Sequence, residues 1–417
     1  MTADADTLRS EIRKKLPELL PHRLGVAVSG GSDSTALMRL LGDIARAEGI
    51  ELFAATVDHG LRPESVAEAA SVAAQADRWG IPHETLKWTG WDKTGNLQDA
   101  ARRARYELLI DWANQMGLKA IALGHTADDQ AETVLMRMAR AAGVSGLSAM
   151  ASMRREHNVS LLRPMLSIPR ERLRKYLRSE NIRWIDDPSN QDQRFDRIKA
   201  RAALSQLAPL GITADTLSRV AENLAQAREA LAHYAQESAM RVVQAKDAGL
   251  CIDQDAYSAL PMEIRRRILA AAAVWIAGGG YSPRHRAVEQ AMNAILNGQT
   301  TTIGGCLLYA EGKKTWISRE LNTIAHQTAR PGEIWDKRWI LTGPRSPNAQ
   351  IRALGEDGIL QVEDWRSTGV PRAVLVSTPA VWSENMLIAA PIAGFPNHWR
   401  VEAPSERPSF HASILSH

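Results

Sequence analysis

Short apolar runs alternate with longer amphipathic segments over the first half of the chain. The apolar runs, which have the length of buried strands, are residues 24–28, 52–57 and 120–123. The segments with apolar positions at helical spacing include residues 65–79, 96–115 and 128–142. Repeated alternation of strand and helix is typical of a parallel sheet with helices on both faces. The pattern therefore predicts an α/β, Rossmann-like nucleotide-binding domain over residues 1–205.

The pattern changes after this domain. Residues 206–248 are rich in Ala, Gln and Glu with apolar positions at helical spacing, which predicts a connecting helix. Residues 249–328 combine a basic amphipathic segment at 260–277 with short strand-like runs, so we expect a mainly helical α+β domain. Residues 329–417 hold nine of the nineteen prolines and five of the twelve tryptophans. Proline disfavours regular helices, and we expect a small β-rich region with its tryptophans in the core.

The most informative stretch follows the first apolar run and reads Ser-Gly-Gly-Ser-Asp-Ser at positions 29–34. Glycines let the backbone come close to a ligand, and the free N–H groups of a starting helix attract anions. The stretch lacks the Gly-Lys-Ser/Thr of a Walker loop and is not Gly-x-Gly-x-x-Gly. An ordinary turn that opens a helix is the alternative to a phosphate site. The predicted phosphate-binding residues are Ser29, Gly30, Gly31, Ser32 and Ser34, and Asp33 belongs to the same predicted cofactor site.

Polar residues also follow the other two predicted strands. Asp58 and His59 end the second run, and Gly124 and His125 follow the third, ahead of Thr126-Ala127-Asp128-Asp129. The carboxyl ends of parallel strands meet at one edge of a sheet, where ligands bind. Carboxylates there suit Mg²⁺, which takes few protein oxygens and completes its shell with phosphate and water. The alternative for Thr126 and Asp129 is a helix cap with an acid in the first turn.

Two arginines lie three positions apart on the predicted helix 96–115 and therefore share a face. These residues, Arg102 and Arg105, would hold a triphosphate or offset the charge of a departing pyrophosphate. Solvated arginines on a surface helix are the alternative.

The net charge is only +4, but residues 150–201 carry thirteen Lys or Arg against seven Asp or Glu. A concentrated basic segment indicates a polyanionic partner, with a solvated helix face as the alternative. Cys251 and Cys306 are too few for a disulfide framework or a four-cysteine metal site, so we expect a reducing, cytoplasmic location. We expect no membrane span, because no apolar run reaches about 20 residues, and no signal peptide.

Five motifs in order give the chain a family resemblance. They are Ser-Gly-Gly-Ser-Asp-Ser at 29–34, Asp-His-Gly-Leu-Arg at 58–62, Ala-Arg-x-x-Arg-Tyr at 101–106, Gly-His-Thr-Ala-Asp-Asp-Gln at 124–130 and Asp-Pro-Ser-Asn at 187–190. Together they resemble the tRNA(Ile)-lysidine synthetase family of the ATP pyrophosphatase (PP-loop) superfamily. The resemblance covers roughly residues 20–205 strongly.

The resemblance implies an activity and a set of partners. ATP, with Mg²⁺, would adenylate the carbonyl oxygen on carbon 2 of the first anticodon cytidine in tRNA(Ile) of anticodon CAU and release pyrophosphate. The L-lysine ε-amine would then displace AMP from carbon 2 to give lysidine. The oligomeric state implied is a homodimer. The nucleotide would contact the loop and also Asp58, His59 and Gly124, while Asp33 and Asp129 would bind Mg²⁺ or its waters.

The resemblance also implies roles for the remaining candidates. Arg102 and Arg105 would stabilise the leaving group, and His125 or Asp128 would orient or deprotonate the nucleophile. The residues expected to bind tRNA phosphates are Arg194, Arg197, Arg201, Arg265 and Arg266.

Two other functions remain as alternatives. One is another PP-loop enzyme, a tRNA thiolase or a small-molecule amide synthetase, although neither cysteine lies near a motif and a small substrate would not need the basic segment. The other is a nucleotide-regulated RNA-binding protein without catalysis, which the intact loop disfavours.

Overall fold

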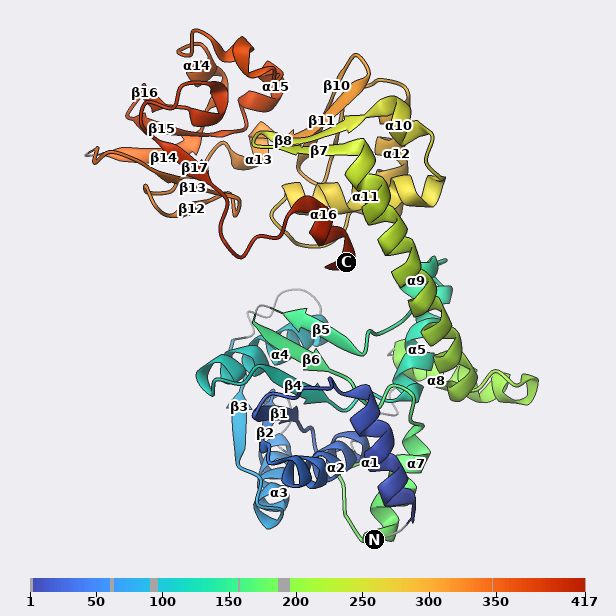
Figure 1. Cartoon of the computed structure of the whole chain (residues 1–417). Helices are drawn as coiled ribbons and strands as arrows, with labels where there is room; N and C mark the ends of the chain where they lie inside the picture. The colour runs from blue at the N-terminus through green and yellow to red at the C-terminus, as the bar shows by residue number, and fades with distance from the viewer. Residues whose placement is uncertain are drawn as a thin grey trace. The chain divides into compact units, whose positions relative to one another are not determined.

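The computed structural model describes residues 3–416 except 61–63, 91–96, 157, 187–195 and 347. The chain forms two compact units, Met1–Arg228 and Glu229–His417. The long helix α9 (Ala214–Val242) contains the boundary, which therefore falls inside the segment for which the sequence predicts a connecting helix. Figure 1 shows the elements of each unit.

The first unit is built on a six-stranded sheet in the order β3-β2-β1-β4-β6-β5. Its strands are β1 (Arg23–Ala27), β2 (Glu51–Asp58), β3 (His83–Lys87), β4 (Ala120–Leu123), β5 (Met153–Glu156) and β6 (Val159–Leu162). All neighbours pair in parallel except β5, which runs antiparallel to β6. The order of connection reverses between β1 and β4. The predicted Rossmann-like sheet is confirmed, and this reversal is where such sheets bind ligands.

Helices cover both faces of the sheet because alternate strand residues point to opposite sides. On β2, Leu52 and Ala54 join one core, whereas Ala55 joins the other. The first core also contains residues of α1 (Ala3–Lys15), α2 (Ser32–Glu48), α3 (Ser65–Arg78) and α7 (Arg170–Ser179). The second core is covered by α4 (Leu97–Gln115). A smaller cluster joins α5 (Ala127–Met138), α6 (Val144–Leu147), α8 (Asp196–Leu207) and α9, and η2 (Ala208–Leu210) follows α8.

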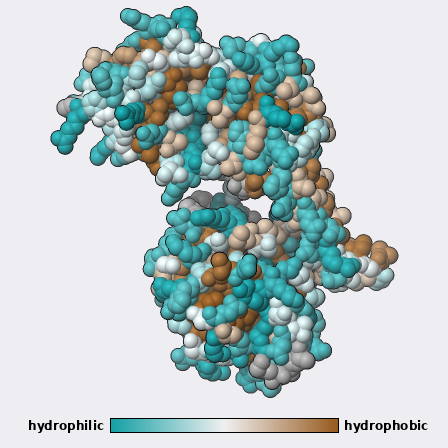
Figure 2. Space-filling model, viewed as in Figure 1, coloured by the Kyte–Doolittle hydropathy of each residue, from teal (hydrophilic) through white to brown (hydrophobic). Residues whose placement is uncertain are grey.

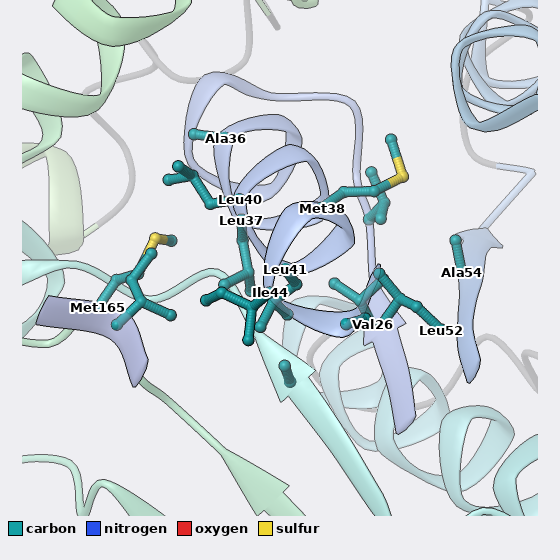
Figure 3. Close-up of a cluster of buried hydrophobic side chains, with 14 of the residues drawn as sticks. Val26, Ala36, Leu37, Met38, Leu40, Leu41, Ile44, Leu52, Ala54 and Met165 are labelled. Carbon is teal, nitrogen blue, oxygen red and sulfur yellow. The ribbon is translucent and has the colours of Figure 1, made fainter. Parts of the chain in front are cut away.

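Helix α2 fixes the position of the predicted phosphate loop. Leu37, Leu41 and Ile44 recur at helical spacing and are buried, and Figure 3 draws them in one cluster with Val26 of β1. The helix ends at Gly49, which takes the left-handed conformation of a C-cap. Packing of this apolar stripe against the sheet therefore leaves the first turn of α2 at the carboxyl end of β1.

The second unit begins with an antiparallel sheet in the order β7-β8-β11-β10-β9. Its strands are β7 (Val243–Lys246), β8 (Gly249–Asp253), β9 (Thr301–Ile303), β10 (Cys306–Glu311) and β11 (Lys314–Arg319). The helices that accompany this sheet are α10 (Gln254–Ser258), α11 (Met262–Ile276), α12 (His285–Leu296) and α13 (Leu321–Ile324). Cys251 and Cys306 are buried free thiols within this part of the chain.

Two three-stranded sheets, β12-β13-β17 and β14-β15-β16, form the predicted β-rich end of the chain. Its strands are β12 (Ile334–Trp335), β13 (Trp339–Thr342), β14 (Ala349–Ala353), β15 (Pro379–Ser383), β16 (Met386–Ala389) and β17 (Arg400–Glu402). Its helices are one or two turns long: α14 (Gly355–Ile359), η3 (Trp365–Thr368), α15 (Arg372–Leu375), η4 (Pro391–Ala393), α16 (Phe410–Ser413) and η5 (Ile414–Ser416). Four of the five tryptophans are buried, as expected: Trp335, Trp339, Trp382 and Trp399.

The visible surface of both units is mostly hydrophilic, with scattered hydrophobic patches (Figure 2). Within the described ranges, no helix combines the length and apolar character needed to cross a membrane.

The core beneath α2 supports a stability prediction. Leu37 is fully buried, and Leu37→Ala should lower the free energy of unfolding of the first unit by about 2–5 kcal/mol through lost burial and a residual cavity. Val66→Ala, at a position 64% exposed on α3, is the matched control and should change it by less than about 0.5 kcal/mol. Denaturant titration followed by circular dichroism measures both. Equal effects of the two substitutions would contradict this assignment of the core.

Candidate active site

The hydroxyl of Ser34 bridges two residues of the loop between β1 and α2. This hydroxyl accepts a hydrogen bond from the Ser29 amide at 3.1 Å and donates to the Gly31 carbonyl at 3.1 Å. Gly31 is the N-cap of α2, and Ser32 and Asp33 form its first turn. The amides of this first turn face the carboxyl edge of the sheet, which is the geometry that binds phosphate groups.

Gly30 is required by its backbone and its neighbour. Its φ of +85° lies in the left-handed region, and a Cβ added there would lie 2.6 Å from Cδ1 of Ile185. The Ile185 amide also donates to the Gly30 carbonyl at 2.9 Å. The segment after α7 therefore packs directly on the loop. The Asp-Pro-Ser-Asn motif at 187–190 follows this segment, but it lies outside the described residues.

Gly124 explains how β4 approaches α2. A Cβ at this position would lie 2.9 Å from Cα of Ser34, a backbone atom that cannot move aside. Close packing here brings the first turn of α5 beside the first turn of α2. In α5 the Asp129 carboxylate accepts hydrogen bonds from the Thr126 amide at 2.9 Å and hydroxyl at 3.0 Å, so the expected cap is present.

A single arginine, Arg170 of α7, joins these two first turns. Its Nε donates to Asp33 at 2.7 Å, and its Nη atoms lie 3.5 Å from Asp129 and 3.9 Å from Glu132. Its backbone amide donates to Asp128 at 2.8 Å, so Asp128 caps the start of α7. Arg170 was not among the predicted site residues, because it belongs to the basic segment that indicates a polyanionic partner.

Burial and Arg170 act in opposite directions on the acids of this cluster. Burial raises the pKa of Asp33 above its ordinary value, although the Arg170 guanidinium opposes the rise. Burial also penalises the Asp129 carboxylate, but Arg170 and the Thr126 amide outweigh it and lower the pKa. Burial raises the pKa of Glu132 despite its ion pair with Arg201. Both Asp33 and Glu132 are therefore easier to protonate than ordinary carboxyl groups.

The predicted nucleotide contacts at the end of β2 form a turn. Asp58 is buried and accepts a hydrogen bond from the Gly60 amide at 2.9 Å, and the Ser65 hydroxyl together with this amide lowers its pKa. His59 packs edge-on against Trp88, with ring centroids 5.7 Å apart. Among the described residues its Nδ1 has no hydrogen-bond partner. Asp58 therefore stabilises the turn, whereas the Nδ1 atom of His59 remains available to a ligand.

Positive charge surrounds His125, which follows β4. Burial lowers its pKa to about 3, and the nearby guanidinium groups of Arg105, Arg163 and Arg197 add to the effect. Arg105 also lowers the pKa of His59, so this one side chain of α4 acts on both strand ends. His125 is consequently neutral at physiological pH.

The remaining predicted arginines divide between the two units. Arg102 lies over the Tyr106 ring at 5.4 Å on an exposed part of α4. Arg201 of α8 donates from Nε and Nη2 to Glu132 at 3.0 and 2.8 Å, which directs it into the carboxylate cluster. In the second unit, Arg266 forms a two-pronged pair with Glu263, and Arg265 lies beside it on α11. Arg194 lies outside the described residues.

Asp33 and Asp129 supply the hard oxygen ligands that Mg²⁺ prefers, and two carboxylates are enough when phosphates and water complete the shell. In the part of the chain that the structure describes, no group of three His, Cys, Asp or Glu side chains is arranged to hold a metal by itself. The chemistry of the two aspartates therefore fits this ion.

Comparison with known proteins places these features in a family context. A family model described as a PP-loop domain matches residues 5–208. The chain is 49% identical to the tRNA(Ile)-lysidine synthase of Ruegeria pomeroyi over the full length of both proteins. It is 40% identical to the tRNA(Ile)-lysidine synthase of Methylobacterium nodulans over 327 residues, which cover 75% of this chain and 96% of that one.

The contact between Gly30 and Ile185 predicts a binding defect. Gly30→Ala should lower ATP affinity at least about tenfold, because the new methyl group must displace either the loop or Ile185. Gly49→Ala is the control, since it also has a positive φ, of 68°, but meets no atom within 4 Å. Isothermal titration with ATP compares the two variants, and equal affinity for both would contradict the steric explanation.

The buried neutral state of His125 predicts a pH dependence of stability. The unfolded imidazole takes up a proton below about pH 6.5, whereas the folded one does so only near its pKa of about 3. Between these values the free energy of unfolding should therefore fall as pH falls, with His125 contributing roughly 1.4 kcal/mol per pH unit. His125→Asn should make this slope shallower by one proton. An unchanged slope between pH 6 and pH 4 would rule out a neutral His125.

Proposed function

The chain belongs to the tRNA(Ile)-lysidine synthase family, and we propose that it uses ATP to attach L-lysine to carbon 2 of the first anticodon cytidine in tRNA(Ile). It is an ATP-using ligase of the PP-loop type. The observation that carries the assignment of ATP to this site is the loop before α2, whose amides and hydroxyls suit phosphate groups at the switch point of the sheet.

ATP activates the base in the first proposed step. The cytidine O2 attacks the α-phosphate, and pyrophosphate departs with the electron pair of the broken bond. A carbonyl oxygen is a poor leaving group, whereas the adenylate is a good one. Ser29, Gly31 and Ser32 would hold the phosphates, and Arg102 and Arg105 would offset the charge of the departing pyrophosphate.

Lysine displaces AMP in the second step, and the carboxylate cluster offers a place for its amines. Glu132 is buried, and its Oε2 has no hydrogen-bond partner within the described parts of the chain. A lysine ammonium group would satisfy that oxygen. His125, with its low pKa, suits orientation of a substrate better than removal of a proton.

Asp33 and Asp129 are the residues that would hold Mg²⁺. The ion, when bound, would neutralise phosphate charge as the α–β bond breaks.

The tRNA would be bound by positive side chains of both units. Arg197 lies near His125, and Arg265 lies on α11. We assign each of these arginines to a contact with a tRNA phosphate. Such contacts are independent of sequence and weaken with salt. The reaction would take place in the cytoplasm, where tRNA is modified, and the enzyme would act as a homodimer.

A direct test incubates the protein with ATP, Mg²⁺, labelled lysine and tRNA(Ile) of anticodon CAU. We expect lysine label in this tRNA, formation of AMP, and no label in the methionine tRNA that shares the anticodon. Binding of ATP and tRNA without any label would contradict the proposed function.

The proposed role of Glu132 gives a separate prediction. Glu132→Gln should raise the KM for lysine by about tenfold or more, because the buried charge that receives the ammonium group is lost. The KM for ATP should change less than about threefold. Glu107→Gln, at an exposed position of α4, is the control. If the KM values for lysine and ATP rise together, Glu132 maintains the site without contacting lysine.

A further inference from the structure

Arg170 uses only part of its hydrogen-bonding capacity on the carboxylates. Among the described residues, its one short side-chain hydrogen bond runs from Nε to Asp33, at 2.7 Å. The approaches of its Nη atoms to Asp129 and Glu132, at 3.5 and 3.9 Å, are electrostatic contacts rather than good hydrogen bonds. A guanidinium group is a planar fork of five N–H donors. Among the residues that the structure describes, the outer donors of Arg170 therefore make only these long contacts, while Nε holds the group beside the first turn of α2.

A second arginine lies one helical turn further along α7. Arg174 shares a face with Arg170, and its Nε lies 3.4 Å from the Ser32 hydroxyl in the predicted phosphate loop. Its Nη2 is 3.7 Å from Asp186, and its side chain is 37% exposed. Arg170 and Arg174 thus approach the start of α2 from the same helix.

Other arginines of α7 point elsewhere and are paired. Arg172 forms ion pairs with Asp4 and Glu11 of α1, and Arg178 pairs with Glu171 on the surface. The two arginines at the loop are therefore distinguished by where their side chains lie, not by the overall charge of the helix.

We propose that Arg170 and Arg174 bind the β- and γ-phosphates of ATP and hold the pyrophosphate as it leaves. This inference rests on the proposed function, in which ATP is cleaved between its α- and β-phosphates. Negative charge accumulates on pyrophosphate as the cytidine O2 bonds to the α-phosphorus and the bond to the bridging oxygen breaks. Guanidinium forks match phosphate oxygens in geometry and charge, so they stabilise this charge as it forms.

Arg170 also makes nucleotide binding compatible with the acids. Asp33, Asp129 and Glu132 would repel a triphosphate placed beside them, and Arg170 lies within 4 Å of all three. The same side chain therefore pairs with Asp33 through Nε, and we assign its outer nitrogens, which lie between the acids, to the phosphates. A lysine at this position would keep the charge but lose the second function.

The test compares pyrophosphate with AMP, which lacks the β- and γ-phosphates. Isothermal titration in one Mg²⁺ buffer uses the wild type, Arg170→Lys, Arg174→Gln and the control Arg178→Gln. We expect pyrophosphate affinity to fall about tenfold for Arg170→Lys and about threefold for Arg174→Gln, with AMP affinity within about twofold of wild type. The control should match wild type for both ligands. Unchanged pyrophosphate affinity, or equal loss for both ligands, would overturn the proposal.

Two further measurements keep the result interpretable. Thermal melting identifies a variant that has lost its fold, and if Arg170→Lys melts early, the partly exposed Arg174 position decides the test. Lysine incorporation into tRNA is measured on the same wild-type sample. If the variants selectively lose pyrophosphate binding but the wild type incorporates no lysine into tRNA, the proposed function is wrong. The assignment of pyrophosphate to Arg170 and Arg174 would still hold in that case.

Discussion

The ion pair between Arg170 and Asp33 is the interaction on which the rest of the site depends. The two residues are 137 positions apart in the chain, and their pairing brings the first turns of α2 and α7 together. Asp128 and Asp129 attach the first turn of α5 to the same arginine. Three helices therefore begin around one guanidinium group. The pair is partly buried, so removing one partner should be destabilising, because the other charged group loses its short hydrogen bond.

Acidic and basic side chains meet at the carboxyl edge of the sheet. Carboxylates gather around Arg170, whereas burial and the charges of Arg105, Arg163 and Arg197 keep His125 neutral against the opposing charge of Asp129. The phosphate loop lies beside these carboxylates. A ligase that combines a polyanionic nucleotide, a tRNA and a cationic amino acid needs both kinds of surface close together, because each substrate requires charge of the opposite sign.

Local sequence patterns predicted the parts of this site that depend on local chemistry. The strand ends, the glycine loop and the Thr126–Asp129 cap all follow from neighbouring residues, and the structure contains each of them. The pairing of Arg170 with Asp33 and of Arg201 with Glu132 was not predictable in this way, since no periodicity links residues so far apart. The sequence predicts that Asp58 contacts the nucleotide, and in the structure its carboxylate accepts a hydrogen bond from the Gly60 amide within its own turn. Only the folded chain distinguishes these outcomes.

A double-mutant cycle on the ligand-free protein tests most directly whether the ion pair organises the site. The free energy of unfolding of the first unit would be measured for wild type, Asp33→Asn, Arg170→Gln and the double variant. The account predicts that each single substitution is destabilising and that the double variant loses less than their sum, with a coupling of about 1 kcal/mol or more. Strictly additive losses would contradict it, because the two side chains would then stabilise the site independently.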